Sequence, residues 1–179
     1  MGEGRVRIIG GAMRSRLIEV ADRPGLRPTP DRVRETLFNW LGQELDGLAC
    51  LDLFAGSGAL GFEAASRGAG RVVMVDSDHA AVKSLLANRE RLGAAKVEVV
   101  QAGALPFLAG ARERFDVVFL DPPFRQNLLP EVMAKLPERL AKNARVYVEA
   151  AAALEWPGWR ELKRGHAGQV SFQLMTWSE

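Results

Sequence analysis

The chain has 179 residues and a mass of 19.6 kDa, which is the size of one ordinary domain with a small extension. Its hydrophobic fraction of 47% and charged fraction of 26% exclude disordered, collagen-like and coiled-coil proteins. The single cysteine excludes an internal disulfide, the two histidines leave little for a metal site, and no uncharged run is long enough to span a membrane. We therefore expect a soluble cytoplasmic protein that holds no metal.

Positive charge is concentrated at the N-terminus, although the net charge is only +2. Residues 1–40 carry eight arginines and five acidic residues, a net charge of +3, and the remainder of the chain carries −1. The arginine guanidinium forms bidentate hydrogen bonds with phosphate and stacks on bases, so this segment is a candidate phosphate-binding arm. The alternative is a solvated arm in a chain that simply prefers arginine, since it has nineteen arginines and five lysines.

The first part of the chain is rich in glycine and proline and allows only two short strands, at 5–9 and 17–20. We expect a basic arm or hairpin over 1–28 and the main domain over 29–179. A helix is predicted to begin at Thr29-Pro30, with Thr29 as its N-cap and Pro30 at the first helical position, and to end at Gly47.

From residue 48 onward, short apolar strands alternate with helices. The predicted strands lie at 49–54, 71–75, 97–100, 116–120 and 145–149, and the predicted helices at 59–67, 79–92, 105–108 and 127–136. This alternation predicts an α/β fold with a parallel, doubly wound sheet. Two further strands are predicted at 159–163 and 169–177, which gives seven in the main domain.

The loop after the first of these strands contains a GxGxxG pattern, formed by Gly56, Gly58 and Gly61, between a strand and a helix. Glycines there let the backbone press against a bound nucleoside. Asp76 ends the next strand twenty residues later, where a carboxylate can accept hydrogen bonds from a ribose. Asp52 would place negative charge where a pyrophosphate needs the opposite, so it favours the ammonium of S-adenosylmethionine over a dinucleotide.

A second motif, Asp121-Pro122-Pro123-Phe124, directly follows the apolar strand at 116–120. We expect it to face the same crevice as the glycine loop, at the carboxyl ends of the strands. A carboxylate and a fixed backbone carbonyl provide two acceptors for an exocyclic amine of a nucleobase, and Phe124 provides a face on which the base can stack.

The chain resembles class I S-adenosylmethionine-dependent methyltransferases, and more narrowly the RsmD family of 16S rRNA guanine-N2 methyltransferases. Beyond the two motifs above, the narrow resemblance rests on segments 7–16, 25–40, 147–149 and 167–169. It implies a Rossmann-like sheet of seven strands with the last antiparallel. It also implies methyl transfer to N2 of a guanine in 16S rRNA, guanine 966 in the family, with the small ribosomal subunit or an assembly intermediate as the partner of a monomeric enzyme.

The resemblance also assigns residues. Catalysis falls to Asp121, Pro122, Pro123 and Phe124, and phosphate contacts to Arg5, Arg7, Arg14 and Arg16. Cofactor binding falls to Arg27, Pro28, Thr29, Asp52, Phe54, Ala55, Gly56, Ser57, Gly58, Asp76, Ser77, Gly103 and Ala104. Gly103 departs from the family pattern of Asp or Asn, so adenine has no side-chain acceptor there.

Three alternatives stay open at this point. A DNA adenine-N6 methyltransferase shares the Asp121–Phe124 chemistry, but such enzymes usually carry a separate target-recognition region. A nicotinamide dehydrogenase would use the glycine loop and give the second motif no role. A non-catalytic RNA-binding assembly factor could retain the fold, although the intact Asp121, Gly56 and Gly58 argue against it.

Overall fold

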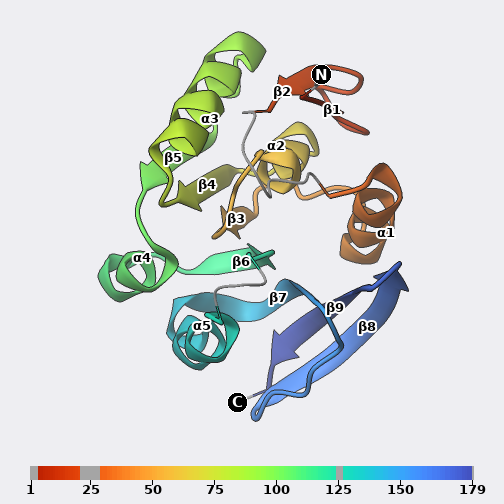
Figure 1. The fold of residues 1–179 in the computed structure, drawn as a ribbon, viewed down its shortest axis with the longest axis vertical. Helices are drawn as coiled ribbons and strands as arrows, with labels where there is room; N and C mark the ends of the chain where they lie inside the picture. The colour runs from red at the N-terminus through yellow and green to blue at the C-terminus, as the bar shows by residue number, and fades with distance from the viewer. Residues whose placement is uncertain (1–3, 21–28, 124–126, 179) are drawn as a thin grey trace.

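Continuously apolar segments form the centre of a seven-stranded sheet in the computed structural model, which describes residues 4–20, 29–123 and 127–178 (Figure 1). The strand order is β5-β4-β3-β6-β7-β9-β8. The strands are β3 (Ala49–Asp52), β4 (Arg71–Asp76), β5 (Val97–Gln101), β6 (Phe115–Leu120), β7 (Leu140–Ala150), β8 (Trp159–Ala167) and β9 (Val170–Trp177). The strands from β5 to β7 are parallel, and β9 runs antiparallel to both β7 and β8. The predicted α/β fold with a final antiparallel strand is therefore confirmed.

Helices cover both faces of the sheet (Figure 1). They are α1 (Asp31–Leu41), α2 (Ala59–Ser66), α3 (His79–Leu92), α4 (Ala104–Gly110) and α5 (Leu129–Lys135), followed by the 3-10 turn η1 (Leu136–Arg139). One core lies under α1, α2 and α3, and a second lies under α4 and α5. Successive strand residues alternate between the two, as with Val72 and Val73, because side chains of a strand point to opposite faces.

The order of the strands creates a switch point between β3 and β6. The chain proceeds outward from β3 through β4 to β5, then returns to place β6 on the other side of β3. Connections therefore leave the carboxyl ends of β3 and β6 in opposite directions, and in open α/β sheets this is the place where ligands bind. The glycine loop follows β3, and the Asp121 motif follows β6.

The N-terminal segment forms the β-hairpin of β1 (Arg5–Arg7) and β2 (Leu17–Glu19), which lies outside α2 and α3 (Figure 1). Side chains of these helices hold its backbone. Glu63 accepts hydrogen bonds from the amides of Ile9 and Gly10, both at 2.9 Å, and Asn88 pairs with the amide and carbonyl of Glu19 at 3.0 and 2.7 Å. The described part of the arm is thus docked on the main domain.

The predicted first helix was wrong at both ends. Pro30 is the N-cap residue, and Thr29 makes no capping bond because its hydroxyl points to Asp121 instead. The helix ends at Leu41, where Gly42 adopts a left-handed φ of 97° and its amide bonds back to the last turn, and not at Gly47. Strands β7 and β8 are longer than predicted because their pairing with β6 and β9 continues beyond the apolar segments, past residues that are polar.

Candidate active site

Four carboxylates stand at the carboxyl ends of four neighbouring strands. Asp52 ends β3, Asp76 ends β4, Asp121 follows β6, and Glu149 lies near the end of β7. The register pairs Asp52 with both Met74 and Phe119, and Leu120 with Val148. Since side chains alternate along each strand, all four carboxylates lie on the side of the sheet that faces α1, α2 and α3.

The glycine loop takes a conformation that favours glycine at two positions. Gly56 and Gly58 have φ angles of 53° and 85°, in the left-handed region that side chains disfavour. A β-carbon on Gly58 would also lie 2.6 Å from Leu85 and 2.8 Å from Phe62. The loop is therefore fixed by backbone geometry and by packing, with Phe54 half-buried and Ala55 and Ser57 buried inside it.

Asp76 ties this loop to the next strand. One carboxylate oxygen accepts the amide of Gly56 at 2.8 Å, and the other accepts the amide of Asp78 at 2.9 Å. Its backbone carbonyl accepts the amide of Ala102 at 3.1 Å, which brings the segment with Gly103 and Ala104 beside it. Each carboxylate oxygen can accept more than one hydrogen bond, so Asp76 keeps capacity for further donors.

Asp52 is a carboxylate placed almost wholly inside the protein, with 2% exposure. The amide of Gly61 donates to it at 3.0 Å, and a β-carbon on Gly61 would lie 3.1 Å from the same oxygen and 2.4 Å from Met74. Burial raises the pKa of Asp52 to about 7, and the negative charge of Asp76 adds to the effect. Such a group favours a cation nearby.

Asp121 begins the second motif and is surrounded mostly by protein. Burial raises its pKa well above the ordinary value, and the neighbouring charges of Glu149 and Asp52 raise it further, while the hydroxyl of Thr29 opposes this at 3.5 Å. Pro122 is buried and Pro123 is exposed. Phe124 lies outside the described residues.

Glu149 completes the site and was not among the predicted site residues. The hydroxyl of Tyr147 donates to its carboxylate at 2.8 Å, and both side chains are buried. Burial raises the pKa of Glu149, and burial beside Glu149 also raises that of the Tyr147 hydroxyl. The only signal in the sequence was its place in segment 147–149 of the family resemblance.

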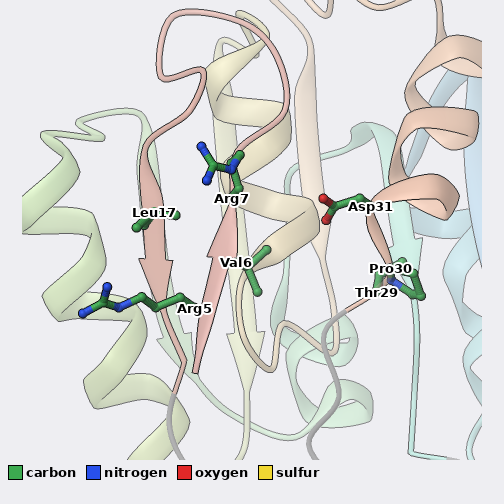
Figure 2. Close-up of a pocket in the computed structure, with 7 residues that line it drawn as sticks. All are labelled: Arg5, Val6, Arg7, Leu17, Thr29, Pro30 and Asp31. Carbon is green, nitrogen blue, oxygen red and sulfur yellow. The ribbon is translucent and has the colours of Figure 1, made fainter. Parts of the chain in front are cut away.

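A cleft of about 500 Å³ lies between β1 and the start of α1 (Figure 2). Its lining consists of Arg5, Val6, Arg7, Leu17, Thr29, Pro30 and Asp31. Val6 points toward the Thr29–Asp31 side, whereas Arg5 points away from it (Figure 2). Thr29 belongs both to this cleft and to the surroundings of Asp121, so the cleft adjoins the candidate site.

The four predicted RNA-binding arginines are exposed on the arm but differ in their surroundings. Arg5 and Arg7 border the cleft, and Arg14 borders a second hollow beside Arg67. Arg16 donates to the carbonyl of Arg91 at 3.1 Å, which gives it a structural contact. Arg27 and Pro28 lie outside the described residues.

Known proteins share both this architecture and the sequence that builds it. The family model described as Conserved hypothetical protein 95 matches residues 6–176. The curated Ribosomal RNA small subunit methyltransferase D of Escherichia coli K12 is 45% identical, covering 97% of this chain and 90% of that protein. The protein of the same name from Haemophilus influenzae is 42% identical, with 96% and 94% covered. The chain belongs to the RsmD family.

A solved structure supports the assignment of this RsmD-family chain. The yhhF protein of Escherichia coli has a TM-score of 0.88 and 44% identity, covering 97% of this chain and 98% of that one. The family resemblance inferred from the motifs is thereby confirmed.

The residues of this family member fit S-adenosylmethionine. The loop at 54–58 provides a glycine backbone at a strand end, Asp76 keeps acceptor capacity, and buried Asp52 suits a positively charged group. Gly103 and Ala104 stand at the start of α4, and Ser77 is exposed directly after Asp76. Gly103 carries no side chain, and a β-carbon there would lie 3.3 Å from Pro106, so this residue can offer a ligand only its backbone.

Within the described ranges, no group of three or more histidine, cysteine, aspartate or glutamate side chains could hold a metal ion. Every helix in the same ranges is too short or too polar to cross a lipid bilayer.

Proposed function

We propose that the protein transfers a methyl group from S-adenosylmethionine to the exocyclic N2 amine of a guanine in 16S rRNA, by family resemblance guanine 966, during maturation of the small ribosomal subunit. The observation that carries the proposal is the position of Asp121 and Pro122 beside the glycine loop, at the switch point between β3 and β6. The names of the RsmD relatives, which specify the RNA of the small ribosomal subunit, support the substrate class.

The cofactor would be held by residues at the ends of β3, β4 and β5. Asp76 would accept hydrogen bonds from the ribose, Asp52 would face the ammonium of the methionine part, and Gly103-Ala104 would border the adenine. When bound, S-adenosylmethionine supplies a methyl group already activated on a sulfonium. The catalytic demand on the chain is therefore mainly alignment of the acceptor.

Asp121 and the carbonyl of Pro122 would orient the acceptor amine. The N2 nitrogen of guanine is a weak nucleophile because its lone pair is delocalised into the ring. Two acceptors that bind its two hydrogens hold the nitrogen toward the methyl group and oppose the planar form of the amine. As the new C–N bond forms, one proton leaves the nitrogen to Asp121 or to water.

The cleft beside Thr29 would hold RNA next to the reacting base. A base must leave its stack to reach Asp121, so a loop nucleotide or a flipped nucleotide is the expected substrate. Arg5 and Arg7 at the cleft would contact phosphates and set the position of the RNA without reading its sequence. We propose that the protein acts as a cytoplasmic monomer on 16S rRNA within the small subunit or an assembly intermediate.

The proposal is tested by mapping modified guanines in rRNA by mass spectrometry. A strain without this gene should lack one N2-methylguanosine in 16S rRNA, and returning the gene should restore it. Returning the gene with Asp121→Asn should leave that guanine unmodified. An unchanged modification pattern on deletion, or loss of a methyl group from an adenine, would contradict the proposal.

A further inference from the structure

Two carboxylates stand next to each other at the end of β6 and β7, and the mechanism above uses only one of them. Leu120 pairs with Val148 in the parallel ladder, so Asp121 and Glu149 follow as the next pair of neighbours. Adjacent strands lie about 4.8 Å apart. Among the described residues, neither carboxylate forms an ion pair with a lysine or arginine.

The surroundings of Glu149 leave one of its oxygens available. Tyr147 donates to Oε2 at 2.8 Å, so this oxygen serves as an acceptor and the carboxylate is fixed in orientation. No other hydrogen bond to Glu149 occurs within the described part of the chain. With 8% exposure and one hydrogen bond from Tyr147, the carboxylate keeps capacity to accept a further donor.

Guanine presents the donor that this arrangement requires. Its Watson–Crick edge carries N1–H directly beside the N2 amine, so a base held by Asp121 through the amine brings N1–H toward the neighbouring strand. Adenine at N1 and cytosine at N3 present an acceptor instead. An ionised carboxylate accepts hydrogen bonds only, so it attracts the first kind of edge and repels the second.

We propose that Glu149 reads the target base by accepting the N1–H of guanine, with Tyr147 as the positioning residue that fixes its carboxylate. The inference rests on the proposed function, because it assumes that Asp121 holds the N2 amine. Burial raises the pKa of both carboxyl groups, and the charge of Glu149 raises that of Asp121 further. Donors from the base reverse this effect by stabilising the ionised forms. The site is thereby selective for a base with adjacent donors.

The test compares guanine with 2-aminopurine at the target position of an RNA substrate. The analogue retains the N2 amine but has an acceptor at N1 and lacks the O6 oxygen. The wild-type protein should methylate it with kcat/KM reduced about 100-fold or more, since a site built to bind an N–H rejects an analogue that lacks it. Glu149→Gln can donate as well as accept. The ratio of kcat/KM for the guanine substrate to kcat/KM for the 2-aminopurine substrate should therefore fall to about 10 or less.

The missing O6 oxygen affects the wild type and Glu149→Gln alike. Only the change in the kcat/KM ratio between these two proteins therefore measures recognition of N1–H. Glu155→Gln, an exposed position after β7, is the matched control and should keep the wild-type ratio. Glu149→Ala removes both attraction and repulsion, and it should also lower the ratio. Tyr147→Phe should lower discrimination partly, because the carboxylate stays in place without its fixed orientation.

An equal loss of activity on both substrates in Glu149→Gln and Glu149→Ala would overturn the inference, as would wild-type protein that uses the two substrates equally well. Unfolding of both variants would show that the carboxylate serves the fold, and would overturn it too. Failure of the proposed function is a separate result, namely that wild-type protein forms no N2-methylguanosine in the guanine substrate.

Discussion

At the scale of single residues, the site combines carboxylates that the fold would be more stable without. Asp52, Asp121 and Glu149 all have raised pKa values because burial disfavours their ionised forms. A raised pKa in the folded state means that the folded protein binds protons more tightly than the unfolded chain. Stability therefore falls as the pH rises from the unfolded pKa through the folded one. The proposed function would explain why the chain carries residues with this cost.

Replacing Asp121 by Asn should raise the stability of the folded protein at alkaline pH and lower the rate of methyl transfer. At about pH 3 the carboxyl is largely protonated in both the folded and the unfolded chain, so the melting temperature should be close to that of the wild type. At pH 8 the variant should melt at higher temperature, because the wild type then carries the cost of a buried charge. Methyl transfer should drop about 100-fold or more, as with other preorganised polar groups.

Thermal scans at the two pH values and single-turnover methyl transfer check this prediction. Glu131→Gln on the exposed surface of α5 is the control, and it should change neither quantity. An Asp121→Asn protein that turns over near the wild-type rate would remove Asp121 from the mechanism.

Asp76 should contribute to cofactor affinity in two ways. It holds the amides of Gly56 and Asp78, and we propose that it also binds the ribose. Asp76→Ala should weaken S-adenosylmethionine binding by about 1.5–3 kcal/mol, the range for hydrogen bonds to a charged group. Calorimetry measures this, and Asp76→Asn should lose less because its amide oxygen still accepts. Unchanged affinity in Asp76→Ala would disprove the assignment.

The sequence predicted Asp52, Asp76 and Asp121 because each lies at the end of a recognisable apolar strand or directly after it. Glu149 escaped the site prediction because its neighbours are set by strand register, which depends on β6 and β7 lying side by side. Thr29 was predicted as a helix cap and, through the family resemblance, as a cofactor-binding residue, but its bond to Asp121 spans 92 residues of sequence. Contacts of that separation have no local pattern.

At the scale of elements, a buried charge cluster joins the arm to α1 and α2. Arg34 and Glu63, both with 0% exposure, form an ion pair at 3.1 Å, and Arg67 pairs with the same carboxylate at 2.8 Å. Arg34 also donates to the carbonyls of Arg7 and Thr29 at 3.0 and 3.3 Å. One side chain thus holds the cleft from both sides, at β1 and at the start of α1.

Removing the charge of Glu63 should loosen the arm. Glu63→Gln leaves two arginines without their buried partner, so we expect a loss of about 3–5 kcal/mol in the free energy of unfolding. Hydrogen exchange of the Ile9 and Gly10 amides should accelerate, since Glu63 accepts both. Asp31→Asn is the matched control, because Asp31 pairs with the same Arg34 but is 68% exposed, and it should lose less than about 1 kcal/mol.

Denaturant unfolding and exchange measured residue by residue separate these outcomes. If Glu63→Gln destabilised the protein no more than Asp31→Asn, the buried cluster would not be what docks the arm.

The arm should also determine the salt dependence of RNA binding. Each phosphate contact contributes about 0.7–0.9 to the log–log slope of affinity against salt. Replacing Arg5, Arg7, Arg14 and Arg16 by Gln should therefore flatten the slope by roughly three units, while cofactor affinity stays unchanged. Arg16 already contacts the Arg91 carbonyl, so its share should be the smallest.

The control for this variant is Arg71→Gln. Arg71 begins β4, at the other end of the strand from Asp76, and pairs with Glu98 and Glu113. It should leave the slope unchanged. If the fourfold variant instead lost stability and retained the wild-type slope, the arginines would be a structural cover and not an RNA contact.

At the scale of the whole molecule, the order of apolar strands and helices was enough to predict the sheet. The runs at 72–75 and 117–120 are apolar on both faces, which indicates strands covered by helices on each side. The docking of the arm could not be predicted, because nothing in the sequence around Glu63 distinguishes it from an ordinary polar residue of α2. Its contacts with the hairpin are apparent only in the structure. The same applies to the cleft, whose walls come from β1 and α1.

This architecture places the glycine loop and the Asp121 motif at neighbouring strand ends, with the cleft lined by Arg5 and Arg7 adjoining them through Thr29. The proposed function requires the three to act together on RNA. The most direct test incubates purified protein with methyl-labelled S-adenosylmethionine and small-subunit RNA or subunits from a strain lacking the gene. We predict close to one labelled methyl group per RNA, on N2 of a single guanine, and an initial rate of labelling reduced about 100-fold or more with Asp121→Asn. Label on adenine, no label on any RNA, or equal labelling by Asp121→Asn would contradict the account.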